Sequence, residues 1–185
     1  MVNRRDEMRI MVLGIGNTLM KDDGAGVAVV TCLSAQVYSD AYSSIVTFLD
    51  GGTLSFPLIP DLTTHDGLIL VDAINLAKPP GTVQIFFGDQ MDQFLTTHRA
   101  SAHDISLMDL FNMMAMLGHK PKNRALIGIQ VEEIGWGDQL TAVVERAIPT
   151  AVHSVLSTIR QWETQNLPFM EDQANVRHHE VDQSA

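Results

Sequence analysis

The stretch of residues 8–26, MRIMVLGIGNTLMKDDGAG, constrains the fold more than any other part of the chain. It begins with an apolar run that breaks into Gly14-Ile15-Gly16, a pattern typical of a buried strand that ends in a tight turn. Asp22 and Asp23 then precede a glycine and an apolar helical segment. We therefore predict a strand, loop and helix unit with two carboxylates beyond the strand, where open α/β sheets place their sites.

The rest of the chain repeats this alternation of apolar strands and helices. Strands are predicted at residues 9–14, 44–49, 67–72, 82–87 and 125–131, and helices at residues 24–36, 107–117 and 139–163. The run GLILVD at residues 67–72 has no alternation, which indicates a strand covered on both faces. The prediction is a single-domain three-layer α/β sandwich with a mostly parallel twisted sheet of about five strands and helices on both faces.

Length and charge exclude several classes of function. We predict one domain over residues 1–164 and a polar, disordered tail over residues 165–185. A net charge of −10 argues against a nucleic acid or an anionic membrane as partner, because both need a basic surface. No apolar run reaches the roughly 18 residues of a membrane span, and we expect no signal peptide and a cytoplasmic protein. The single cysteine, Cys32, is expected in the core of the first helix.

The glycine turn at Gly14 and Gly16 first suggests a dinucleotide-binding loop. Leu19 stands where the third glycine of that fingerprint belongs, and Asp22 and Asp23 would repel a pyrophosphate. A nucleotide cradle is therefore disfavoured. The two aspartates can also be interpreted as first-turn acids that complement a helix dipole.

Other polar residues stand where predicted strands and helices end or begin. Asp72 ends an apolar strand, where a buried carboxylate needs a partner or a ligand. Asp50 either joins it or shapes its own Asp-Gly-Gly turn. His103 follows a possible helix cap at Ser101, with His98 as a nearby competitor. Two carboxylates and one imidazole form a ligand set for Ni, Zn, Fe or Mn, and spacing does not choose among these metals.

The ordered set of motifs resembles the hydrogenase maturation endopeptidases. The resemblance covers residues 8–163 and lies in the segments GIGNTL (14–19), DDGAG (22–26), DGGT (50–53), VDA (71–73) and SAH (101–103). It implies a nickel-dependent enzyme that removes a C-terminal extension from the precursor of a [NiFe]-hydrogenase large subunit. The nickel would be supplied by the substrate rather than held permanently, and a transient partner favours a monomer.

The resemblance also implies roles for individual residues. The family's metal-contacting and catalytic positions carry over to Asp23, Asp72 and His103, and Asp23 is a shorter acid than the glutamate of some members. The DGGT motif implies a substrate-facing loop formed by Asp50, Gly51, Gly52 and Thr53. Two alternatives remain open from the residues alone: a metal- or nucleotide-binding module without proteolysis, and a metallohydrolase that acts on a small molecule.

Overall fold

The computed structural model describes residues 8–35, 45–53, 59–97 and 111–166. Its strands are β1 (Arg9–Ile15), β2 (Ile45–Gly52), β3 (Gly67–Ile74), β4 (Val83–Phe87) and β5 (Asn123–Gln130). Its helices are the 3-10 turn η1 (Asp22–Gly24), α1 (Ala25–Ala35), α2 (Ile59–Leu62), α3 (Gly88–Thr97) and α5 (Ala142–Asn166). Residues 111–116 are also helical.

The strands form one sheet in the order β2-β1-β3-β5-β4. The strands β2, β1, β3 and β5 run parallel to one another, and β4 pairs antiparallel with β5 at the edge of the sheet. Side chains of β1, β3 and β5 are buried on both faces for most of their length, whereas those of β4 are half-buried. These burial patterns explain why the central strands are unbroken apolar runs, and they confirm the predicted mostly parallel sheet.

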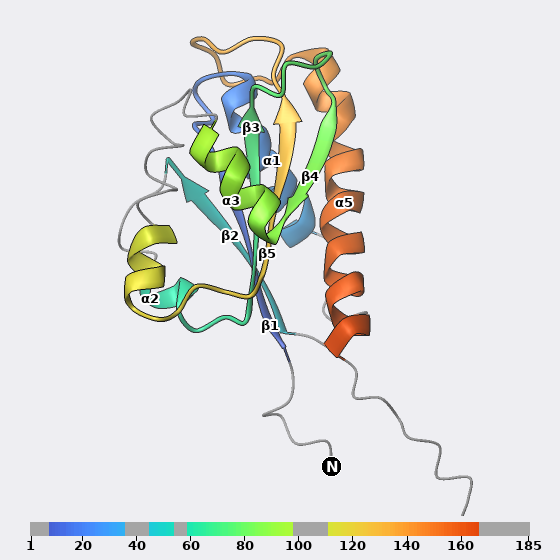
Figure 1. The fold of residues 1–185 in the computed structure, drawn as a ribbon. Helices are drawn as coiled ribbons and strands as arrows, with labels where there is room; N and C mark the ends of the chain where they lie inside the picture. Colours follow the sequence, from blue (N-terminus) through green and yellow to red (C-terminus); the bar gives the residue numbers. More distant parts are fainter. Residues whose placement is uncertain (1–7, 36–44, 54–58, 98–110, 167–185) are drawn as a thin grey trace, which may run out of the picture.

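Helices cover both faces of the sheet and complete three layers (Figure 1). α1 and α5 pack on one face, where Val29, Leu33, Val155 and Trp162 join the core. On the other face, α3 contributes Met91 and Leu95. The three-layer sandwich is confirmed, but α3 was not predicted, because only two of its ten residues are buried.

The order of the strands creates a switch point at the carboxyl end of the sheet. β1 lies between β2 and β3, so the chain leaves β1 toward one side for β2 and returns to the other side for β3. Open α/β sheets bind ligands beyond the carboxyl ends of the strands at such a point. The fold therefore directs attention to the loop after β1 and to the end of β3.

The structure extends the predicted last helix and leaves the tail prediction untested. α5 continues through Pro149 to Asn166, and residues 167–185 lie outside the described residues. Within the described part of the chain, no helix is both long and apolar enough to cross a membrane.

Candidate active site at the carboxyl end of the sheet

Glycines let the start of α1 approach the ends of β1 and β3 closely. A Cβ atom on Gly26 would lie 2.2 Å from the carbonyl oxygen of Val71 and 2.4 Å from that of Ile15. A Cβ on Gly16, whose φ is +130°, would lie 1.7 Å from the carbonyl oxygen of Asp23. Since no other residue fits such contacts, these glycines bring η1 against β3.

Asp23 and Asp72 are both buried at this end of the sheet. Asp23 lies in η1 with 7% of its surface exposed, and its Oδ2 accepts a hydrogen bond of 2.8 Å from the backbone N–H of Asn17. Asp72 lies in β3 with 2% exposed, opposite Gly128 of β5. Because η1 packs on β3, the structure places both predicted carboxylates at the switch point.

Asp22 has a different role from its neighbour. Its Oδ2 accepts hydrogen bonds from the backbone N–H groups of Glu132 and Glu133, both 2.9 Å, and from Oγ1 of Thr141 at 3.0 Å. Its Oδ1 accepts the N–H of Thr141 at 2.7 Å. The carboxylate is fully buried, so it fastens the segment that follows β5 to the loop that follows β1.

The third predicted metal-contacting residue is outside the described structure. His103, together with Ser101 and the competitor His98, falls within residues 98–110, which are not described. Among the residues that are described, no three His, Cys, Asp or Glu side chains gather as a metal-binding group. The set of Asp23, Asp72 and His103 therefore stays a prediction.

The Asp-Gly-Gly-Thr motif shapes the end of β2 beside the site. Oδ1 of Asp50 accepts a hydrogen bond of 2.8 Å from the N–H of Gly52, and the carbonyl oxygen of Gly52 accepts one of 2.8 Å from Gly16. The register between β1 and β2 shifts here, because Gly14 pairs with Asp50 and Ile15 with Gly52. The motif thus supports the glycine turn of β1, while Asp50 and Thr53 are exposed.

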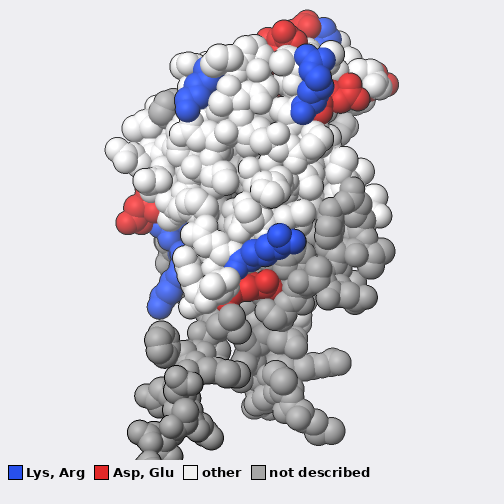
Figure 2. All heavy atoms as spheres, turned by 90° about the vertical axis from the view of Figure 1, so that its right-hand side faces the viewer, with Lys and Arg blue, Asp and Glu red and all other residues white. Residues whose placement is uncertain are grey.

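Charged side chains concentrate at the two ends of the face that α5 covers, with an uncharged band between them (Figure 2). At the carboxyl end, Lys21 forms an ion pair with Glu133. This pair joins the same two loops that Asp22 connects.

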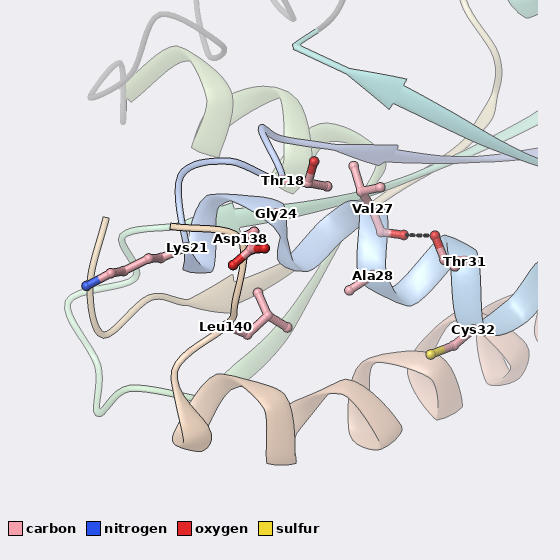
Figure 3. Close-up of a pocket in the computed structure, with 9 residues that line it drawn as sticks. All are labelled: Thr18, Lys21, Gly24, Val27, Ala28, Thr31, Cys32, Asp138 and Leu140. Atoms are coloured by element: carbon pink, nitrogen blue, oxygen red, sulfur yellow. Dashed lines mark hydrogen bonds between the residues drawn. The ribbon is translucent and has the colours of Figure 1, made fainter. Parts of the chain in front are cut away.

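A cavity of about 290 Å³ lies between α1 and the segment before α5 (Figure 3). Val27 and Ala28 of α1 line it on one side and Leu140 on the other. Cys32 also lines it and is exposed, so the prediction that Cys32 belongs to the core is wrong. The helix buries Val29, Val30 and Leu33, and this register turns position 32 outward.

Sequence reasoning also missed a group of exposed apolar side chains in the two loops that Asp22 connects. Leu19 stands in the loop after β1, and Ile134 and Trp136 stand in the loop after β5. The sequence did contain a signal for this group, because Trp136 stands between two glycines in a loop that follows a buried strand. A large apolar side chain in such a loop is not expected to reach the core.

Comparison with known proteins identifies the family of this chain. A family model described as hydrogenase maturation protease matches residues 27–158. The chain belongs to the hydrogenase maturation protease family. It is therefore a peptide hydrolase, and the two other classes that the residues left open are not supported. The matched residues include Asp72 and His103 and begin four residues after Asp23.

Two individual relatives are similar to this chain over most of their length. The hydrogenase 2 maturation protease of Escherichia coli (strain K12) is 35% identical over 162 residues, which are 87% of this chain and 96% of that protein. The hydrogenase expression/formation protein HupD of Rhizobium leguminosarum bv. viciae is 36% identical over 83% of this chain and 75% of its own.

Solved structures agree with this assignment. The hydrogenase maturating endopeptidase HybD from E. coli superposes with a TM-score of 0.74 at 33% identity, covering 84% of this chain and 94% of that one. The [NiFe] hydrogenase maturation protease HybD from Thermococcus kodakarensis gives a TM-score of 0.68 at 30% identity, covering 81% of this chain and 98% of that one. The fold is therefore that of the hydrogenase maturation proteases.

Proposed function

We propose that this protease removes the C-terminal extension from the precursor of a [NiFe]-hydrogenase large subunit after nickel has been inserted. In this proposal, Asp23, Asp72 and His103 recognise the nickel that the precursor carries. The observation that carries it is the presence of two buried carboxylates at the switch point of a hydrogenase maturation protease fold. The proposed enzyme is a cytoplasmic monomer that meets its substrate transiently.

The donor set suits nickel that belongs to the substrate. Carboxylate oxygens and imidazole nitrogens are accepted ligands of divalent first-row metals, and two carboxylates with one imidazole leave positions for ligands of the precursor. Burial of Asp23 and Asp72 strengthens their attraction for a cation, because the surroundings screen charge less than water does. A precursor without nickel would lack this anchor.

The same carboxylates can carry out hydrolysis. One of them accepts a proton from a water molecule as the water oxygen attacks the scissile carbonyl carbon. The C–N bond then breaks, and the leaving amine takes up the proton. Nickel in the substrate stabilises the negative charge that develops on the carbonyl oxygen.

The exposed side chains of the Asp-Gly-Gly-Thr motif are proposed to contact the precursor. Asp50 and Thr53 are accessible at the end of β2, and Gly52 connects this strand to the glycine turn that precedes Asp23. A peptide that crosses the carboxyl end of the sheet would pass both the motif and the carboxylates.

Mass spectrometry of a purified precursor incubated with the protease tests the proposal. Asp23→Asn, Asp72→Asn and His103→Ala should each slow the shortening of nickel-loaded precursor by more than about 100-fold, as loss of an acid–base or metal-contacting group does. Glu145→Gln is the control, because it removes an exposed carboxylate that lies on α5, outside the loops that follow β1 and β5. Full activity of Asp72→Asn, or no shortening by the wild-type protein, would contradict the proposal.

A further inference from the structure

Three exposed apolar side chains form what we call the apolar rim: Leu19, Ile134 and Trp136. Their exposed fractions are 58%, 55% and 83%. They stand in the loops that follow β1 and β5, at the carboxyl end of the sheet where Asp23 and Asp72 lie. A cluster of large, solvent-exposed apolar side chains marks an interaction surface more often than single scattered ones do.

The backbone beneath the apolar rim is firmly held. Met20 bridges to Gly137 and Lys21 to Ile134, so the two loops pair like short strands. The N–H of Gly137 donates to the carbonyl oxygen of Leu19 at 3.0 Å, and the N–H of Lys21 donates to Gly137 at 2.9 Å. With the hydrogen bonds of the Asp22 carboxylate added, the rim residues are presented in a fixed arrangement rather than on a loose loop.

We propose that the apolar rim is the surface on which the folded precursor docks, and this rests on the function proposed above. Leu19 lies four residues before Asp23, and Ile134 follows Glu133, whose N–H is held by Asp22. A folded protein that brings a peptide bond and its metal to Asp23 and Asp72 would therefore approach these loops, which lie at the same end of the sheet. Apolar contact at this end would also help to exclude water from the reaction.

Charge and shape favour an apolar rather than an electrostatic contact. Lys21 and Glu133, which stand beside the rim residues, form an ion pair with each other, so these two charges offset one another. The 290 Å³ cavity adjoins the same loops through Thr18 and Asp138, and its lining is mostly apolar (Figure 3). Aromatic side chains such as Trp136, when a partner buries them on binding, often supply much of the affinity of a protein interface.

Trp136→Ser and the double variant Ile134→Ser/Trp136→Ser test the docking surface. The KM for nickel-loaded full-length precursor should rise about tenfold or more, as at an interface hot spot, while kcat at saturating precursor stays within about twofold. Met116→Ser is the matched control, since Met116 is 89% exposed and lies on the helical residues 111–116, away from the carboxyl end. Each variant is also placed in the Asp72→Asn background, and its binding to precursor is measured without turnover.

The outcomes separate docking from catalysis. Weaker binding by the rim variants with unchanged binding by Met116→Ser supports the docking surface, even if the wild-type protein proves not to cleave the precursor. Unchanged KM and unchanged binding overturn it while leaving the protease function intact. A change in oligomeric state on size-exclusion chromatography without a change in precursor binding would assign the rim to a second copy of the chain and also overturn the proposal.

Discussion

The two ends of the sheet use carboxylates in opposite ways. At the amino end, Asp92 of α3 accepts two hydrogen bonds from Arg124, at 3.0 and 2.7 Å, and one from Lys120 at 2.6 Å. At the carboxyl end, the four groups that donate to Asp22 are neutral. Cations surround the first carboxylate, whereas neutral donors satisfy the second. The difference shows that the amino end pairs its carboxylate with opposite charges, while the carboxyl end uses Asp22 to hold two loops together through neutral hydrogen bonds.

The pKa values at the amino end follow from this pairing. Burial alone would raise the pKa of Asp92, but the hydrogen bonds from Arg124 and Lys120 outweigh it and lower the pKa below its ordinary value. The hydrogen bond to Asp92 likewise raises the pKa of Arg124. Both groups therefore stay charged in the folded protein over the whole neutral range.

The largest expected effect comes from the close packing at the carboxyl end. Gly26→Ala places a methyl group against two carbonyl oxygens and should lower the free energy of unfolding by about 3 kcal/mol. Urea denaturation measures the loss. Gly135→Ala in the loop after β5 is the control, because its nearest neighbour would be 3.9 Å away, and it should change stability by less than about 0.5 kcal/mol. Equal stability of the two variants would contradict the packing account.

Asp22→Asn should have the next largest effect. The amide cannot accept every hydrogen bond of the carboxylate, so at least one buried N–H loses its partner at a cost of about 2 kcal/mol. Hydrogen exchange at Glu132, Glu133 and Thr141 should accelerate. Asp138→Asn removes the same charge from an exposed position and should leave this exchange unchanged. Unaltered exchange in Asp22→Asn would show that the loop does not depend on this carboxylate.

The smallest effect is expected at the amino end. Asp92→Asn should cost about 1–2 kcal/mol of stability near pH 7, because it weakens a partly exposed ion-pair cluster, and it should leave precursor processing unchanged. Since folding lowers the pKa of Asp92, its contribution is present above the ordinary pKa of an aspartate and is lost as the pH falls through the lowered value. Thermal unfolding of both proteins over an acidic pH series should therefore show the difference shrinking with acid. Slower processing of the precursor by Asp92→Asn would contradict the claim that the amino end of the sheet contributes to stability but not to catalysis.

The sequence predicted the sheet well because its central strands are largely apolar runs bounded by polar or glycine residues. The five predicted strands correspond to β1–β5 within a few residues. α3 was missed because only three of its ten residues, Met91, Phe94 and Leu95, are apolar, although these three stand at helical spacing. Cys32 was wrongly predicted to be buried because α1 carries apolar residues on several of its faces. Its sequence pattern therefore does not indicate which positions face the sheet.

The sequence only partly revealed that Asp22 and Asp23 have different roles. Adjacent aspartates at a loop exit look alike in sequence, and only the path of residues 132–141 reveals that Asp22 is engaged by a distant segment. The apolar rim depends on the same long-range pairing, because nothing local connects Leu19 to Ile134 and Trp136. Contacts between segments more than 100 residues apart are not encoded in local patterns.

Processing of nickel-loaded and nickel-free precursor by the same enzyme preparation tests the central claim most directly. The mass of the large subunit is followed over time in both reactions. If Asp23, Asp72 and His103 recognise nickel in the substrate, the loaded precursor should be shortened and the nickel-free precursor should keep its extension. Shortening of both precursors at the same rate would contradict the account.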